Sequence, residues 1–589
     1  MLKRYKVYLI WGLVLIMVLF GSLGANALGA SARGYHQNAA QAGHTDSPGK
    51  SASVKTAAPH TVNMQDVPGE KHQPASTHSR DLSFQTGVSP AVYAQRKAAA
   101  AHYKNGVRVF TPYSLPPRTA KTVGPHTPGL LKSFNGMSDS TSICPPFGCE
   151  PPDMALAVSF SWVFQGVNTS FAVYDLNGNL QSGWPKTAQS FFGIPNPPNN
   201  CDPNGPFLTD PRAFYDQNDN RFWATIEQVE GVSGKGPNCP FQTLHWIAVS
   251  SNGNPNGSWH IYNFEMSLGS GNWADYPGFG FDQQAIYFSA NMFTTGGSFQ
   301  YAEYFGARKH VMENGQSVTA FGFTGPTHSG TAIDTVQPVL GESLQVGGAL
   351  GGQFISSLNI LFGGGQCVNG CSGVLVISMS NPGFSNTFAT ILFVDTGNYF
   401  LAPRADEPSC NLCIETIDTR ITGTPTWQRG MITFALETAA SNGTQIVPAI
   451  FWAQIVVSLN DDGSISGASV FQSNYFGFSS DTAASFGTLG TDSDGDLYML
   501  YEFMGSAFNP SVAYLARRVT LALGALHDTG VLLRGGDASY GGSRWGDYEA
   551  VSPSGVPFTN DVWFSGQYAT SNGDWSTFIG RAKFVAGQS

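Results

Sequence analysis

From Lys132 onward, short apolar segments alternate with turns rich in Asp, Asn and Gly. A unit opens with a small or polar residue, often Asp, continues as a short apolar strand, turns, and returns as a second strand with paired aromatic residues. Residues 210–216, for example, turn at 217–220 and return as 221–226. Short runs of this kind, bounded by turn residues, predict β-strands joined by tight turns.

The same unit recurs along the chain. Clear starts lie near residues 153, 210, 275, 486 and 547, with a weaker one near 418. A spacing of roughly 60 to 70 residues leaves room for one more unit near Gly347, and it fits four-stranded propeller blades with long loops. We therefore predict an all-β fold, a seven-bladed β-propeller over residues 126–589. A six-bladed ring or a pair of β-sandwiches is the alternative.

The first 32 residues have the pattern of a signal peptide. Lys3, Arg4 and Lys6 precede an apolar run from Val7 to Phe20, and small residues follow up to position 32. This order is typical of a signal peptide, with an uncleaved membrane anchor as the alternative. We expect a secreted or cell-surface protein that meets a membrane only if this segment is retained.

Residues 33–125 form a leader of different composition, rich in His, Ala, Ser, Pro and Lys. Such a segment is predicted to be disordered or of low complexity. Ser89 as a cap, Pro90 at the first helical position and the stop at Asn105-Gly106 predict one short helix over about residues 90–105. The leader is a pro-segment, a spacer or a brace on the main domain.

Composition and charge narrow the classes of function. Charged residues make up only 12% of the chain, which also contains 69 Gly, 35 Pro and 13% aromatic residues, as expected for many short strands. The net charge of -10 argues against nucleic acid or an anionic membrane as a partner. We expect a monomer whose partner is an extracellular glycan or a surface protein.

The eight cysteines are predicted to form disulfides, because an exported chain with an even number of cysteines favours them. The expected pairs are Cys144 with Cys149, Cys201 with Cys239, Cys367 with Cys371, and Cys410 with Cys413. The alternative is a zinc site built from the last four of these residues.

Several segments resemble a known family. The segments PPDMALAV, TDPRAFYDQNDNRFWAT, ADYPGFGFD and RWGDYEAVSP are similar to those of secreted bacterial sialidase-like (Asp-box-type) β-propeller proteins. The resemblance covers about residues 130–585 and implies the fold and an exported location, but no single reaction. The two closest matches to the turn motif of true sialidases, at 251–259 and 571–575, are degenerate, and no F-R-I-P segment is present.

Candidate chemistry lies at the strand starts, because the first strand of every blade lines the central channel of a propeller. The predicted catalytic residues are Asp153, Asp210, Asp275, Asp547 and Tyr548. The predicted substrate-binding residues are Arg212, Tyr276, Arg420, Arg544 and Trp545, and Asp418 belongs to the same set. Carboxylates in one cavity raise each other's pKa, and arginines bind an acidic sugar. The structural alternative is that the Asp residues cap turns and the Arg residues pair with them.

Two function classes follow from these residues. The first is a carbohydrate-active enzyme, a glycoside hydrolase or polysaccharide lyase, and the second is a non-catalytic glycan- or protein-binding module. No cofactor is expected. Residues 492–496 (DSDGD) are similar to a calcium loop, but Phe503 stands where the loop needs Glu, which favours an ordinary turn.

Overall fold

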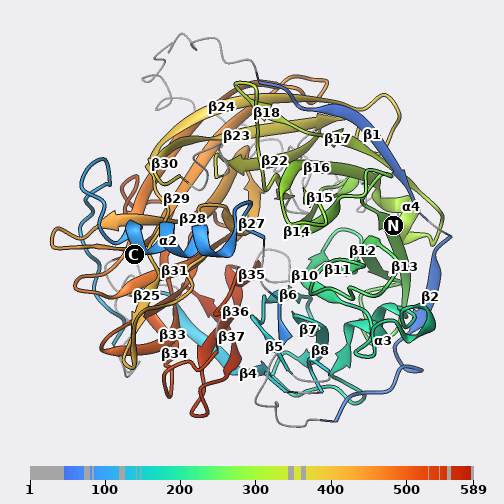
Figure 1. Ribbon diagram of the computed structural model, residues 1–589, viewed down its shortest axis with the longest axis horizontal. Helices are drawn as coiled ribbons and strands as arrows, with labels where there is room; N and C mark the ends of the chain where they lie inside the picture. Colours follow the sequence, from blue (N-terminus) through green and yellow to red (C-terminus); the bar gives the residue numbers. More distant parts are fainter. Residues whose placement is uncertain are drawn as a thin grey trace, which may run out of the picture. The chain divides into compact units, whose positions relative to one another are not determined.

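The computed structural model describes residues 46–56, 58–71, 80–82, 85–117, 127–140, 142–145, 148–341, 351–359, 367–527, 530–542, 544–553 and 559–584. They lie in one compact unit that begins at Asp46. Seven sheets of four or five strands stand around one axis (Figure 1). The predicted seven-bladed β-propeller is confirmed. The predicted signal peptide over residues 1–32 lies outside the described residues.

Blades 1 to 3 come from the first half of the chain, and each is an antiparallel meander. Blade 1 contains β6 (Ala155–Val158), β7 (Trp162–Val167), β8 (Ser170–Asp175) and β9 (Lys186–Thr187). Blade 2 contains β10 (Leu208–Asp216), β11 (Arg221–Glu230), β12 (Gln242–Ser250) and β13 (Ser258–Glu265). Blade 3 contains β14 (Trp273–Phe281), β15 (Ala285–Phe293), β16 (Phe299–Arg308) and β17 (Thr319–Thr324).

Blades 4 to 6 follow the same plan. Blade 4 contains β20 (Gln337–Pro338), β22 (Gly351–Ser357), β23 (Cys371–Ser380) and β24 (Phe388–Tyr399). Blade 5 contains β27 (Ile421–Gln428), β28 (Met431–Ser441), β29 (Ile446–Leu459) and β30 (Ile465–Phe476), with β21 (Leu340–Gly341) parallel to β27. Blade 6 contains β31 (Ala483–Thr491), β32 (Leu497–Gly505), β33 (Phe508–Arg517) and β34 (Val531–Arg534).

Blade 7 closes the ring by joining the two ends of the propeller. It contains β35 (Ala550–Pro553), β36 (Asp561–Ala569), β37 (Trp575–Lys583) and β4 (Gly129–Ser138). The strand β4 precedes blade 1 in the chain, yet it pairs antiparallel with β37. Closure of this kind leaves no blade without its neighbour, so the ring has no open end.

Two parts of the leader also join blades, which corrects the expectation that it lacks regular structure. The strand β1 (Lys50–Lys55) pairs with β17 of blade 3, and β2 (His60–Asn63) pairs with β13 of blade 2. The predicted helix is present as α2 (Pro90–Ala100), capped by the Ser89 side chain and shorter than expected at its C-terminal end. These segments show that the leader is built into the propeller at several points.

The remaining elements are short. They are the strand pairs β3 (Arg80–Asp81) with β5 (Cys149–Glu150), β18 (Thr327–His328) with β19 (Thr331–Ala332), and β25 (Ala405–Glu407) with β26 (Cys410–Ile414), and the helices α3 (Ala188–Phe192), η1 (Pro198–Asn200) and α4 (Lys309–Glu313). Among the described residues, no helix is long and apolar enough to cross a membrane.

The hydrophobic core lies between neighbouring blades. Phe164 of blade 1, for example, packs against Phe222 and Trp259 of blade 2, with ring centroids 6.0 and 5.5 Å apart. Aromatic residues on the second strand therefore fill the wedge between two blades, which explains why the sequence repeats them.

Three of the four predicted disulfides are present, joining Cys144 to Cys149, Cys201 to Cys239, and Cys367 to Cys371. The fourth is wrong, because Cys410 and Cys413 are both free thiols in the hairpin β25–β26. The zinc alternative is wrong as well, since two of its four ligands are already joined to each other. Three disulfides fit an oxidising compartment.

Candidate functional site

Most blades have a residue in the left-handed backbone region close to the start of the innermost strand. These residues are Asp153 (φ 42°), Asp210 (φ 60°), Tyr276 (φ 56°), Thr335 (φ 49°) and Phe486 (φ 54°). The pairing register shifts at the same place in β10, β14 and β31. Bulges of this kind turn a side chain away from the regular strand direction, and non-glycine residues adopt them only where the surroundings hold them.

Hydrogen bonds from the preceding blade hold these starts in place. In each case a side-chain oxygen on a second strand, or just after it, accepts a backbone N–H of the next blade. The pairs are Asn168 with Asp210 (2.7 Å), Asn291 with Thr335 (2.6 Å), Asn359 with Thr419 (3.1 Å) and Glu437 with Phe486 (3.2 Å). Some of the polar side chains near the axis therefore connect neighbouring blades.

Asp153, Asp210, Asp275 and Asp547, here called the aspartate cluster, come from four blades and are all buried. The Asp547 backbone N–H donates to Asp153 Oδ1 at 3.1 Å. Burial, together with the charge of Asp275, raises the pKa of Asp210 to about 6. Burial raises the pKa of Asp547 to about 6 as well, although Arg544 opposes it. Raised pKa values within one buried cluster allow a protonated carboxyl group to stand beside an ionised one near neutral pH.

Three arginines surround the cluster, and two of them pair with aspartates. Arg420 donates to both carboxylate oxygens of Asp418 at 2.7 and 2.8 Å, and Arg544 pairs with Asp547. Arg212 differs, because its guanidinium lies 3.5 Å from the ring centroid of Tyr548 and makes no ion pair among the described residues. Its Nε donates to Pro277 O at 3.4 Å. Arg212 is therefore the one arginine of these three without a carboxylate partner among the described residues.

Three buried polar atoms of the site have no hydrogen-bond partner among the described residues: Arg212 Nη2, Tyr276 Oη and Asp547 Oδ2. An unsatisfied buried polar group costs about 1 to 3 kcal/mol. A polar ligand with several hydroxyl groups would satisfy donors and acceptors of this kind, as in other polar binding sites.

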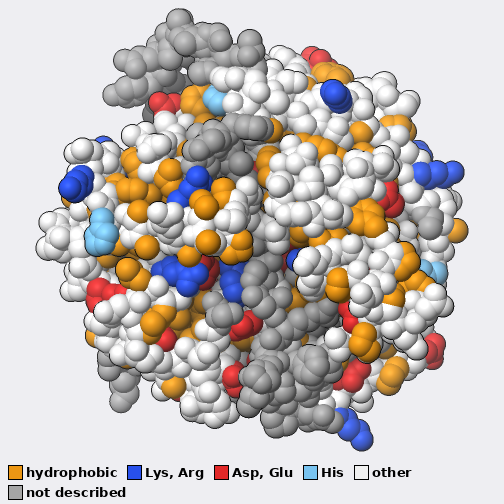
Figure 2. All heavy atoms as spheres, in the orientation of Figure 1, with side chains coloured by type: hydrophobic (Ala, Val, Ile, Leu, Met, Phe, Trp, Pro, Cys, Tyr) orange, Lys and Arg blue, Asp and Glu red, His pale blue; other side chains and the backbone are white. Residues whose placement is uncertain are grey.

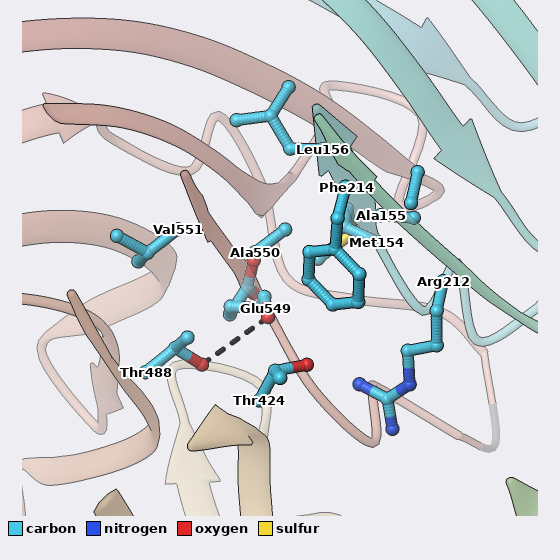
Figure 3. A pocket seen from close by; sticks show the side chains of 11 residues that line it. Met154, Ala155, Leu156, Arg212, Phe214, Thr424, Thr488, Glu549, Ala550 and Val551 are labelled. Carbon is cyan, nitrogen blue, oxygen red and sulfur yellow. Dashed lines mark hydrogen bonds between the residues drawn. The ribbon is translucent and has the colours of Figure 1, made fainter. Parts of the chain in front are cut away.

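The central channel beside the cluster is narrow. Figure 3 shows Arg212 and Phe214 of blade 2 facing Thr488 of blade 6 and Glu549 of blade 7 across it. The cavity has a volume of about 20 Å³, which suits one water molecule and no sugar ring. A ligand would therefore have to bind at the mouth of the channel.

Residues 85–100, here called the strap, begin at the aspartate cluster and include α2. The Gln85 backbone N–H donates to Asp275 Oδ2 at 2.9 Å. Further along, Lys97 is fully buried and its Nζ lies 3.3 Å from Glu415 Oε1. The helix runs outward from near the axis (Figure 1), and charged side chains of both signs are visible near the middle of this face (Figure 2).

The structure brings the eleven predicted site residues together around the axis, and none is more than 7% exposed. Trp545 donates its Nε1 to Glu502, packs against Tyr540 and is buried, so it is not open to a ligand. Tyr276 and Tyr548 have ring centroids 6.0 Å apart. Burial raises the pKa of both tyrosines, which makes them neutral hydrogen-bond donors.

Sequence reasoning missed several residues of the site. The start of blade 4 is Asp334-Thr335, earlier than the expected position near Gly347, which lies outside the described residues. Asp334 accepts from Asn359 Nδ2 at 2.9 Å. It follows the same small-or-polar pattern as the other starts, so the pattern itself was a usable signal. Glu502 and Glu549 carry no such signal, because their pairing depends on two blades meeting; burial raises the pKa of Glu502 to about 7.

The loop at residues 492–496 forms a tight turn. Asp492 Oδ1 accepts the backbone N–H of Asp494 and of Asp496, both at 3.0 Å. One carboxylate oxygen of Asp492 is therefore used to hold the turn between β31 and β32.

No protein-family model and no curated protein matches the sequence. Among solved structures, the chain is similar to extracellular domains 1–2 of Drosophila semaphorin 1b, with 7% identity, coverage of 78% of this chain and 88% of that one, and a TM-score of 0.33. It is also similar to the Dos1 propeller (9% identity, 77% and 94% coverage, TM-score 0.32) and to a thermostable family-43 glycoside hydrolase (11% identity, 64% and 91% coverage, TM-score 0.28). Likenesses this distant carry no argument about chemistry, and the propeller assignment rests on the seven sheets themselves.

Proposed function

We propose that this β-propeller protein is a carbohydrate-active enzyme, a glycoside hydrolase acting on extracellular glycans at the aspartate cluster. The observation that carries the proposal is the buried cluster of carboxylates from four blades, in which burial raises the pKa of Asp210 and of Asp547 to about 6. Hydrolysis of a glycosidic bond needs one protonated carboxyl group as acid and one ionised carboxylate as base or nucleophile.

The neighbouring residues support a hydrolase over a lyase. A lyase would need a strong base for a carbon-bound proton, but the pKa of Tyr276 and of Tyr548 is raised, so neither phenol ionises readily. Arg212 would hold a carboxylate or hydroxyl group of the substrate through its free Nη2. Three disulfides support an extracellular location for the reaction.

The sialidase-like resemblance belongs to this proposal too. The degenerate turns at 251–259 and 571–575 support it, because each ends in a fully buried tryptophan whose Nε1 binds a backbone carbonyl. Trp259 donates to Pro255 O at 3.0 Å, and Trp575 donates to Cys149 O at 2.6 Å.

The test is to incubate the whole protein with neutral, uronate-containing and sialylated glycans and to follow reducing ends. We expect turnover that Asp547→Asn abolishes while glycan affinity stays within about threefold. Asp537→Asn, at an exposed ion pair with Arg534, is the matched control. Turnover that survives Asp547→Asn would show that the cluster is not catalytic.

A non-catalytic binding module is the second candidate, and the pairing of two site arginines with aspartates favours it. The eleven residues are at most 7% exposed, and Arg420 and Arg544 already pair with aspartates. Under this reading, a glycan or surface protein binds without any reaction. Retention of a glycan with no product over the whole panel would establish it.

A further inference from the structure

Three carboxylates of blades 2 and 3 share one lysine at the end of β10 that is opposite to Asp210. Asp216 ends β10, Asp219 lies in the turn that follows, and Glu313 is the last residue of α4. Lys309 Nζ lies 2.5 Å from Asp216 Oδ2 and 2.8 Å from Asp219 Oδ2. No other lysine or arginine among the described residues forms an ion pair with the three. When all three are ionised, three negative charges face one positive charge, and a divalent cation would balance the remainder.

His310 adds a nitrogen ligand to this group. Its Nδ1 lies 2.7 Å from Glu313 Oε2 and 3.9 Å from Asp219 Oδ2. One possible ligand atom from each of these three residues lies within 4.8 Å of the other two. The Glu313 side chain is only 8% exposed, yet its Oε1 is buried without a hydrogen-bond partner among the described residues. Buried carboxylates are normally paired or coordinate a metal, so this oxygen is available to a cation.

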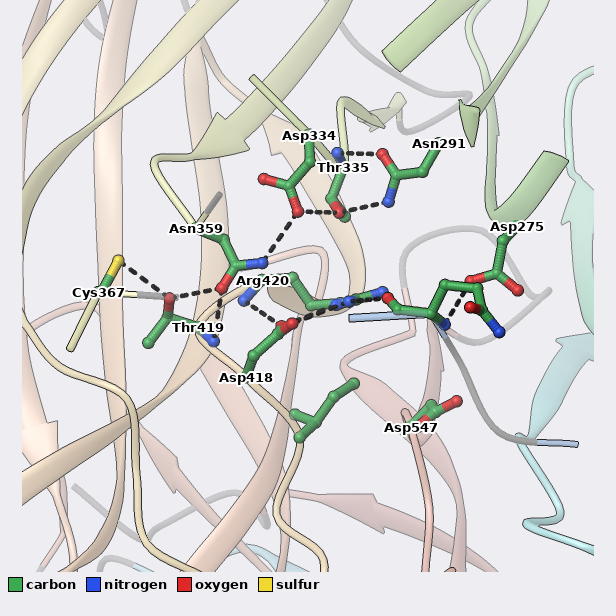
Figure 4. Close-up of polar contacts among 12 residues, drawn as sticks. Asp275, Asn291, Asp334, Thr335, Asn359, Cys367, Asp418, Thr419, Arg420 and Asp547 are labelled. Atoms are coloured by element: carbon green, nitrogen blue, oxygen red, sulfur yellow. Dashed lines mark hydrogen bonds and ion pairs between the residues drawn. The ribbon is translucent and has the colours of Figure 1, made fainter. Parts of the chain in front are cut away.

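Acidic groups near the axis are satisfied in another way. Figure 4 shows Arg420 donating to both oxygens of Asp418, and Asp334 accepting from Asn359. The protein supplies the donors there. No arginine or amide side chain among the described residues donates to Glu313, whose Oε2 contacts only an imidazole. A cation from solution would therefore provide what the chain itself does not.

The fold holds both segments of this group in place. Tyr262 of blade 2 donates its hydroxyl to Met312 O at 2.7 Å, which fixes α4 against the neighbouring blade. Asp216 Oδ1 accepts the Asn218 N–H at 3.0 Å and so shapes the turn between β10 and β11. Ligands on two segments that are already fixed lose little conformational freedom when a metal binds.

We propose that Asp219, His310 and Glu313 bind a zinc ion, which joins the β10–β11 turn of blade 2 to α4 of blade 3. Imidazole nitrogen and carboxylate oxygen are common zinc ligands, whereas calcium and magnesium prefer oxygen alone. Because this group and the aspartate cluster lie at opposite ends of β10, the inference is independent of the proposed function.

The distances require only a small adjustment. Tetrahedral zinc with ligands at about 2.0 to 2.2 Å separates its ligand atoms by roughly 3.3 to 3.6 Å. The 2.7 Å contact of His310 with Glu313 would open, and its 3.9 Å approach to Asp219 would close, by about 0.5 Å or slightly more each. The His310 side chain is 63% exposed, so its ring can turn by this amount.

The test is a calorimetric zinc titration of the full-length protein after a chelator has removed bound metal. Cys410 and Cys413 are free thiols that would also bind zinc, so every titrated protein carries Cys410→Ser and Cys413→Ser. We expect one zinc site that His310→Ala and Glu313→Gln each weaken by at least about tenfold. The matched control is His102→Ala, at an exposed histidine outside the group, which should leave zinc binding unchanged.

Thermal unfolding provides a second readout. We expect His310→Ala to melt like its parent without metal, since the side chain is mostly exposed, and to lose the rise in Tm that zinc produces in the parent. No zinc binding up to about 100 µM would overturn the site. Equal zinc binding by His310→Ala, or equal binding of calcium by the parent, would overturn it too. If Glu313→Gln alters the metal-free protein, the result for His310→Ala decides the outcome.

Discussion

The attachment of α2 to the propeller depends on one buried cation, and its removal gives the sharpest test of the structure. Lys97 Nζ donates to Thr416 Oγ1 at 2.7 Å and to Ile417 O at 2.6 Å, and it lies 3.3 Å from Glu415 Oε1. Lys97→Met keeps most of the apolar stem and deletes the charge. Loss of one member of a buried ion pair costs about 3 to 5 kcal/mol.

Glu415 would retain two partners in the variant. Tyr93 Oη donates to Glu415 Oε1 at 3.0 Å, and Arg404, which is 34% exposed, lies 3.1 Å from Oε2. These contacts put the expected loss at the low end, about 3 kcal/mol, or more than 100-fold in the opening equilibrium of the strap. Because the seven sheets do not include the strap, we expect the loss to appear as local opening rather than as a lower global stability.

Amide hydrogen exchange resolves the two kinds of opening. We expect amide protection over residues 90–100 to fall by about 100-fold in Lys97→Met, while the denaturant midpoint stays nearly unchanged. Gln95→Ala, at an exposed position of the same helix, should behave like the unmodified protein. The effect should also depend on pH. Burial alone would raise the pKa of Glu415, but Lys97 and Arg404 lower it to about 2. This stabilisation is therefore present above about 4.5 and lost as the pH falls toward 2, so the two proteins should converge in acid. A change in protection of less than about threefold would refute the role of Lys97.

Three further predictions concern the cluster, the ring and the thiols. Asp210→Asn should raise the free energy of unfolding at pH 7 by about 3 kcal/mol and remove its dependence on pH. The reason is that a folded-state pKa of about 6, against an ordinary 3.8, makes stability fall as the pH rises between these values. A urea midpoint that does not change across this pH range would contradict the prediction. Gln165→Leu should lower the free energy of urea unfolding by about 3 kcal/mol, since Gln165 forms hydrogen bonds with Met137, Ser565 and Thr577 of blade 7 at 2.8 to 3.0 Å. Gln300→Leu, at an exposed position, is the control. Equal urea midpoints for the two variants would show that these bonds do not hold the ring closed. Unreduced, denatured protein should react with two equivalents of a thiol reagent, at Cys410 and Cys413, whereas no reaction would mean that these two cysteines are joined.

Much of the fold could be predicted from local patterns in the chain. An apolar strand between Asp- and Gly-rich turns is recognisable because side chains alternate across a strand and only a few residues suit tight turns. The starts at Asp153, Asp210 and Asp547 were found in this way, and a repeated unit with one buried face leads to a closed ring. Blade 4 was misplaced because its first strand, β20, spans only Gln337–Pro338 and offers almost no pattern.

The sequence by itself determined the strands, the repeat and the set of charged residues that face the axis. Only the tertiary structure decided what those residues touch. Arg420 donates a hydrogen bond to the carbonyl oxygen of Gln85, which lies 335 positions away in the chain. Gln165 bonds to residues of blade 7 that lie about 400 positions away. Contacts between residues so far apart in the sequence form only when the ring closes and the strap docks. No period or spacing encodes them, because they depend on the position of every blade between the two residues.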